Sequence, residues 1–118
     1  MEDAARAHLA ALEQAPRIGF DTFILSASTP FAPGDALLLK RDARAVIARH
    51  FPQAADLYAR HGWELPASIG RVYDARRAER VLGYRCATDF AAILDALDRD
   101  QPLPFAHDPD YISPQLRA

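Results

Sequence analysis

The chain has 118 residues; half of them are hydrophobic, a quarter are charged, and the formal net charge at pH 7 is −2. This balance is typical of a single small globular domain, and it argues against intrinsic disorder and against a general nucleic-acid-binding surface. No apolar run approaches the roughly 18–20 residues of a membrane span, and the acidic start predicts no signal peptide, so we expect no membrane association.

The first helix is predicted over residues 2–14, where apolar residues have loose helical spacing and two acidic residues come first. We expect Pro16 and Gly19 to end this helix. The next segment, 21–28, has the sequence DTFILSAS. It is β-branched and aromatic with apolar residues on both faces, which predicts a buried strand.

A loop and two helices are predicted next. Residues 29–35 contain two prolines and a glycine, which favour a loop. Asp35 is placed to cap the helix that follows it. Residues 36–50 predict either one helix or a short turn followed by a helix from Asp42. A Phe-Pro pair then breaks the helical pattern, and we expect a further helix over 53–61.

A short extended piece precedes a basic helix. Residues 71–73, Arg-Val-Tyr, are β-like, and Asp74 is placed to cap a helix over 75–82. Gly83 is expected to end this helix in the left-handed conformation. Three arginines on the helix are interpreted as a solvated face that nearby carboxylates offset.

The last helix is predicted over 89–99, with Thr88 as its cap. Residues 101–118 contain four prolines and little periodicity, which predicts a tail. We therefore expect one small domain over 1–100, mainly α with one or two short strands, an α+β fold. The strand has only a three-residue candidate neighbour, so its backbone groups require a sheet from another chain or from a missing part of this one.

Titratable and nucleophilic residues form no recognisable catalytic constellation. The four histidines are scattered and lack the spacing of a metal site, so we expect no metal. The single cysteine, Cys86, has no partner for an internal disulfide, which predicts a reducing, cytoplasmic location. Cys86 itself is interpreted as a small, buried or half-buried residue.

Three blocks of sequence carry a family resemblance, and their order and spacing agree with that family. They are EDAARAHLAALE (2–13), FDTFILSASTPF (20–31) and WELPASIGRVYDARRAERVLGYRCATDFAAIL (63–94). Together they resemble the C-terminal, substrate-side part of extended short-chain dehydrogenase/reductases, the NAD(P)-dependent epimerase/dehydratase family. The resemblance implies the C-terminal portion of such a protein without its Rossmann domain.

The resemblance also implies a binding site for a nucleotide sugar or related small molecule. Arg71 matches the arginine that lies near the substrate diphosphate, and a guanidinium pairs well with phosphate. Thr29 and Phe31 match a loop near the substrate, and Tyr73 is a further candidate for the pocket. Gly70 stands where relatives often have Asp, which is a departure from the family pattern.

The chain lacks the family's cofactor and acid–base motifs. Its five glycines are too far apart for a Gly-rich dinucleotide turn. The Tyr-x-x-x-Lys pair is missing too, because the sole lysine, Lys40, has Ala36 four residues before it. No catalytic or cofactor-binding residue is assigned here, although NAD or NADP is implied for a complete family member. Met1 stands where relatives commonly have Val, which suggests a truncated reading frame or a split protein.

Two functional hypotheses follow. The first is the substrate-side segment of an epimerase/dehydratase-like protein that is not catalytically complete alone. The second is a non-catalytic association domain that forms a homo-oligomer or pairs with a separate Rossmann subunit. For individual residues, Arg71 is also open to a structural role that holds a helix or a loop carbonyl, and Tyr73 to a place in the core.

Overall fold

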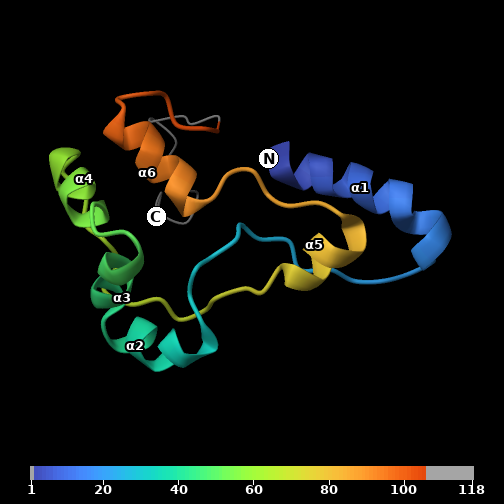
Figure 1. Ribbon diagram of the computed structural model, residues 1–118, viewed down its shortest axis with the longest axis horizontal. Helices are drawn as coiled ribbons and strands as arrows, with labels where there is room; N and C mark the ends of the chain where they lie inside the picture. Colours follow the sequence, from blue (N-terminus) through green and yellow to red (C-terminus); the bar gives the residue numbers. More distant parts are fainter. Residues whose placement is uncertain (1, 106–118) are drawn as a thin grey trace, which may run out of the picture.

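The computed structural model describes residues 2–105, and the part of the predicted tail over 106–118 lies outside this range. The described chain is mainly helical (Figure 1). Its elements are α1 (Glu2–Ile18), a 3₁₀ turn η1 (Pro33–Asp35), α2 (Ala36–Arg41), α3 (Ala43–His50), α4 (Ala54–Arg60), α5 (Arg76–Leu82) and α6 (Phe90–Asp98).

The predicted strand over 21–28 is wrong, as is the strand content of the predicted α+β fold. Residues 20–31 are extended but make no backbone–backbone hydrogen bond within the described part of the chain. The second extended segment, over residues 70–74, does not pair with them through its backbone either. The sequence supplies strand-forming side chains, whereas a strand also requires a neighbouring backbone, and residues 2–105 do not place one in register.

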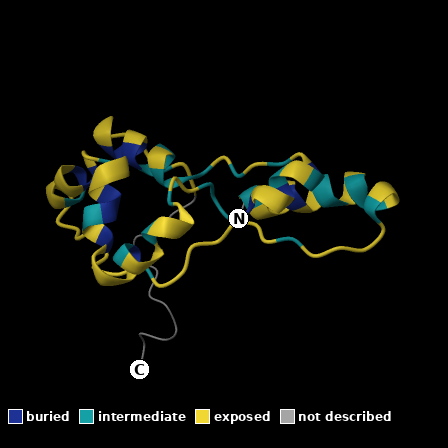
Figure 2. Ribbon diagram, turned by 60° about the horizontal axis from the view of Figure 1, so that its bottom comes forward, coloured by how far each residue is buried: buried dark blue, intermediate teal, exposed yellow. Residues whose placement is uncertain are grey.

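Four helices form the helical body, which we define as α2, α3, α4 and α6. Its core contains apolar side chains from each of these helices, and in Figure 2 the buried residues concentrate here. The largest fully buried side chains are Leu39, Val46, Leu57 and Leu94. Two edge-to-face ring contacts extend the packing, since Phe51 and Phe90 lie 5.0 Å apart between centroids and Tyr58 and Trp63 lie 5.8 Å apart.

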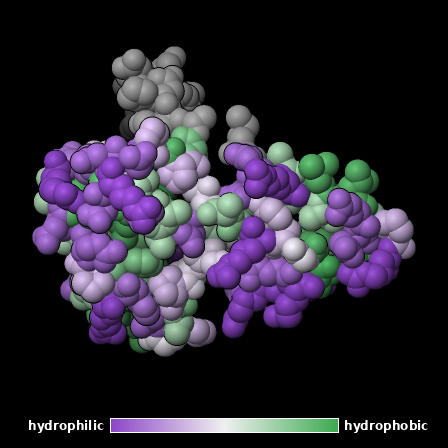
Figure 3. All heavy atoms as spheres, turned by 45° about the horizontal axis from the view of Figure 1, so that its top comes forward, coloured by the Kyte–Doolittle hydropathy of each residue, from purple (hydrophilic) through white to green (hydrophobic). Residues whose placement is uncertain are grey.

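Helices α1 and α5 form a second unit, which we call the α1–α5 arm. In Figure 1 the arm lies beside the helical body, and extended segments connect the two. Ala7, Ala78 and Leu82 are buried in the arm. However, Leu9 and Leu12 of α1 are 61% and 70% exposed, so the apolar stripe recognised in the sequence faces outward. Figure 3 shows hydrophobic side chains reaching the surface at the end of the molecule that the arm occupies.

Two helix ends agree with the sequence signals, those at Asp42 and at Gly83. The long segment 36–50 divides at Asp42, whose carboxylate accepts a hydrogen bond from the Ala45 N–H at 3.1 Å. Gly83 ends α5 with φ 68°, as predicted, because glycine adopts the left-handed conformation without strain. The prediction that Asp74 caps this helix is wrong, since Ala75 is the N-cap of α5; the Asp74 carboxylate lies one residue earlier and accepts a hydrogen bond from the Arg76 N–H at 3.0 Å.

Three further predicted helix signals are corrected. Helix α1 continues through Pro16 to Ile18, because a proline in the last turn removes only one helical hydrogen bond and Gly19 closes the helix onto Ala15. Asp89, not Thr88, caps α6. The Asp35 side chain does not cap α2; its carboxylate turns back to accept from the Ala32 N–H.

Candidate functional site

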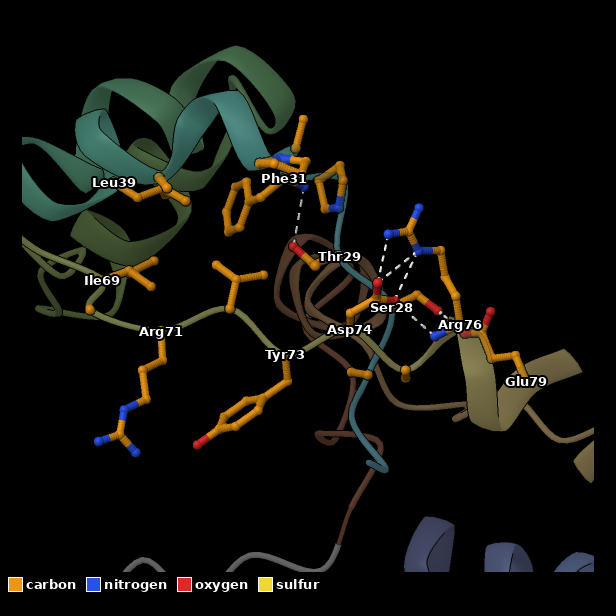
Figure 4. Close-up of a pocket in the computed structure, with 18 of the residues that line it drawn as sticks. Ser28, Thr29, Phe31, Leu39, Ile69, Arg71, Tyr73, Asp74, Arg76 and Glu79 are labelled. Carbon is orange, nitrogen blue, oxygen red and sulfur yellow. Dashed lines mark hydrogen bonds and ion pairs between the residues drawn. The ribbon is translucent and has the colours of Figure 1, made fainter. Parts of the chain in front are cut away.

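The four substrate-site candidates from the sequence all line one groove. It has a volume of about 720 Å³ and lies where residues 27–33 pass the segment 69–76 (Figure 4). Thr29 and Phe31 belong to the first segment and Arg71 and Tyr73 to the second, so about forty residues of chain separate the two walls. The groove continues over α2 at Leu39 and over α5 at Glu79.

The candidates do not all face the same way. In Figure 4 Arg71 and Tyr73 project from the same side of their segment, and both point away from Phe31 and Leu39. This follows from the extended backbone, in which residues two apart share a face. The groove therefore has an apolar wall at Phe31 and Leu39 and a polar edge at Arg71 and Tyr73.

Arg71 is exposed and makes no hydrogen bond or ion pair within residues 2–105. The alternative structural role, in which it would hold a helix or a loop carbonyl, is not observed there. The neighbouring Arg76 is different, because its Nε and Nη2 hold both Asp74 carboxylate oxygens at 2.6–3.1 Å. This pairing keeps the pKa of Asp74 well below its ordinary range. Arg71 is thus the guanidinium of the groove that is available to an anion.

Tyr73 is 54% exposed, so the alternative that placed it in the core is wrong. The physical reason is the missing sheet. None of the residues from 2 to 105 pairs with the segment 70–74 to form a sheet, so the Tyr73 ring lies on an open side of that segment. Its backbone carbonyl receives only a long hydrogen bond from the Ser26 hydroxyl, at 3.5 Å.

The basic face of α5 is exposed, as expected, and one of its arginines has a further role. Arg77 forms an ion pair with Asp21, donates to the Thr22 carbonyl at 2.9 Å and lies over the Phe23 ring, 5.0 Å from the centroid. The ion pair lowers the pKa of Asp21. Arg77 therefore anchors the start of the extended segment that forms one wall of the groove.

A second anchor lies within the groove, and the sequence did not indicate it. Ser28, Glu79 and Arg85 come together from three separate stretches of chain. Ser28 lies 51 residues from Glu79, so no local spacing points to this contact. Polarity does not single out Ser28 either, because it is one of four polar residues over 21–28.

Within residues 2–105, the remaining titratable groups give no second site. Burial raises the pKa of the half-buried Cys86 thiol, which lowers its thiolate fraction and its reactivity. Among the described residues, no cluster of three or more His, Cys, Asp or Glu side chains is placed to hold a metal ion. None of the helices within residues 2–105 is both long and apolar enough to span a bilayer.

Comparisons of this chain with protein-family models, with curated proteins and with solved structures find no match. The resemblance inferred from the three sequence blocks therefore stays a prediction.

Proposed function

We propose that this chain is the substrate-side segment of an NAD(P)-dependent epimerase/dehydratase-like protein and that its groove binds a nucleotide sugar or a related anionic molecule. One observation carries the proposal. Four residues selected from two separate sequence blocks line a single groove, and the arginine among them has no partner in the described chain. The chain supplies binding residues only, so the Rossmann domain with its NAD or NADP would come from elsewhere.

The lining of the groove suits such a ligand. Arg71 offers a planar fork of donors that matches two phosphate oxygens. The rings of Phe31 and Tyr73 and the side chain of Leu39 provide apolar contact area. Three arginines and two carboxylates, Asp74 and Glu79, line the groove, which leaves one positive charge in excess at neutral pH.

The test is calorimetric titration of the purified chain with UDP-glucose, GDP-mannose and inorganic pyrophosphate. Arg71→Gln removes the charge while retaining most of the side-chain length, and we expect it to weaken binding by about tenfold or more. Arg41→Gln is the matched control, because Arg41 is exposed and lies outside the groove. No binding of any probe by the unmodified chain, or equal binding by both variants, would refute the proposal.

We also propose association as the alternative function, as a homo-oligomer or with a separate Rossmann subunit. It is favoured by the backbone of residues 20–31, which is unpaired within the described chain, and by the exposed side chains along it. Phe20 is 92% exposed and Ile24 is 54% exposed. An extended backbone edge with apolar side chains is the chemistry that another strand recognises.

Light scattering tests the homo-oligomer directly. We expect a dimer or larger species and expect Ile24→Lys to convert it to a monomer, because a charge opposes strand pairing. Leu37→Lys, at an exposed position on α2, is the control for added charge. A monodisperse monomer of the unmodified chain would count against self-association, and pull-down with a separately expressed Rossmann subunit would then test the other form.

A further inference from the structure

The segment that forms one wall of the groove belongs to no sheet among residues 2–105. Residues 20–31 make no backbone–backbone hydrogen bonds within the described chain, so side-chain contacts must fix their position. Arg77 anchors the beginning of this segment at Asp21 and Thr22. The end that enters the groove begins at Ser28, where a different set of contacts is found.

Ser28 is half-buried, and its hydroxyl makes two hydrogen bonds. The Ser28 Oγ lies 2.9 Å from Glu79 Oε1, and Arg85 Nε lies 2.8 Å from the same Oγ. Because an arginine N–H only donates and a carboxylate only accepts, the hydroxyl must accept from Arg85 and donate to Glu79. This fixes the direction of both hydrogen bonds.

Glu79 is the best-shielded charge of this cluster. Its side chain is 28% exposed, compared with 70% for Arg85, and the two charged groups are 3.7 Å apart. Glu79 lies on α5 two residues after Arg77, so one short helix holds the segment at both ends. The contacts are directional, and they connect α5 to the residue immediately before Thr29.

We propose that Ser28 and Glu79, supported by Arg85, are positioning residues that hold the Thr29–Phe31 wall of the groove in its binding geometry. Beyond Ser28 the wall is held by Phe31, which packs against the core of the helical body with its ring 5.7 Å from that of His50, and by two short-range hydrogen bonds. The Phe31 N–H donates to the Thr29 hydroxyl at 3.3 Å, and the Ala32 N–H donates to Asp35. Loss of the Ser28–Glu79 contact therefore frees the wall at its Ser28 end. Because both side chains also line the groove, the ligand-free chain provides the test that separates positioning from direct contact with the ligand.

The role in ligand binding rests on the proposed function, whereas the effect on the wall is measurable in the free protein. The variants are Ser28→Ala and Glu79→Ala, which remove the hydrogen bond, and Ser28→Thr, which keeps a hydroxyl. Ser68→Ala is the control, because Ser68 is exposed and lies outside the groove. The first measurement is the backbone amide resonances of Thr29 and Phe31 without ligand. The second is the dissociation constant for UDP-glucose.

We expect Ser28→Ala and Glu79→Ala to shift or broaden the Thr29 and Phe31 resonances and to weaken UDP-glucose binding by about fivefold to tenfold. Ser28→Thr should stay within about twofold of the unmodified chain, as should Ser68→Ala. A hydroxyl-dependent rescue separates positioning from a general loss of stability. Shifted resonances in a chain that binds none of the probes would support the positioning pair and refute the proposed function. Unchanged Thr29 and Phe31 resonances, or equal losses in the alanine and threonine variants of Ser28, would overturn the positioning role.

Discussion

The helical body and the α1–α5 arm hold themselves together by different means. In the body, leucines and a valine from successive helices are almost completely buried against one another. In the arm, small residues such as Ala7 and Ala78 fill the contact between the helices, and the larger Leu9 and Leu12 remain exposed. Burial of apolar area is the main favourable term in folding. Because the large buried apolar side chains lie mainly in the body, the arm depends more on polar contacts.

The polar contacts of the arm concentrate at Asp3. Its carboxylate accepts hydrogen bonds from the Tyr84 hydroxyl and from the backbone N–H groups of Ala87 and Thr88. These bonds lower the pKa of Asp3 to about 2. The same contact raises the pKa of Tyr84 to about 12. One polar side chain near the start of α1 thus joins the arm to the connector that leads into α6. The helices of the body are joined instead by buried apolar side chains.

The largest expected effect comes from substituting two leucines of α2, one buried and one exposed, and comparing the stability of the two variants. Leu39 is 1% exposed and Leu37 is 73% exposed, although both belong to the same six-residue helix. We expect Leu39→Ala to lower the free energy of unfolding by about 2–5 kcal/mol, because it leaves a cavity in the body. Leu37→Ala should change it by less than about 0.5 kcal/mol. Urea denaturation measures both, and similar costs for the two variants would show that the body is not packed as described.

Removal of the Asp3 carboxylate, which anchors the arm, should cause the next largest loss in the free energy of unfolding. Asp3→Ala leaves the Tyr84 hydroxyl and two backbone N–H groups without their acceptor, and we expect a loss of about 1–3 kcal/mol. Glu13→Ala, an exposed acidic residue on the same helix, is the control and should cost little. The thermal midpoint is a sufficient measurement. A midpoint for Asp3→Ala equal to that of the control would mean that the arm does not depend on this contact.

The same carboxylate predicts an acid dependence of stability. The pKa of Asp3 is lowered from 3.8 to about 2 in the folded chain, so its contribution is fully present above pH ~4 and is lost as the pH falls towards 2. Because the group is close to water, we expect this contribution to be about 1 kcal/mol rather than the larger value that the pKa shift alone implies. Chemical denaturation at several pH values measures it. Asp3→Asn should flatten this part of the profile, and an unchanged slope in that variant would contradict the assignment.

The features that the sequence predicted well are those decided within a few residues. Asp42 and Gly83 mark helix ends because capping and the left-handed conformation depend on local backbone chemistry. The strand over 21–28 was wrong because its side chains favour extension, whereas pairing depends on a neighbour that the described chain does not place. Helix α1 was recognised, but its exposed leucines were not, since helical spacing shows that residues share a face and not what covers that face.

In the candidate site too, some features were predicted from the sequence and others were not. Arg71, Thr29, Phe31 and Tyr73 were chosen from a family resemblance, and the structure brings them to one groove. The contact between Ser28 and Glu79 had no sequence signal, because it joins residues that are close only in the folded chain. Polar pairs of this kind depend on the relative placement of two segments, and a single sequence contains no direct record of that placement.

The smallest expected effect concerns the outward face of the arm. Leu12 is 70% exposed, so Leu12→Ala should change the free energy of unfolding of the monomer by less than about 0.5 kcal/mol. Leu39→Ala provides the contrast of a leucine buried within one chain. The measurement should be repeated over a range of protein concentrations, because burial between chains makes stability depend on concentration. A cost above about 1 kcal/mol that grows with concentration would show that the arm is covered in solution, and the association function would then take precedence. A small, concentration-independent cost would mean that the arm is held to the chain by Asp3 and its partners and not by its leucines.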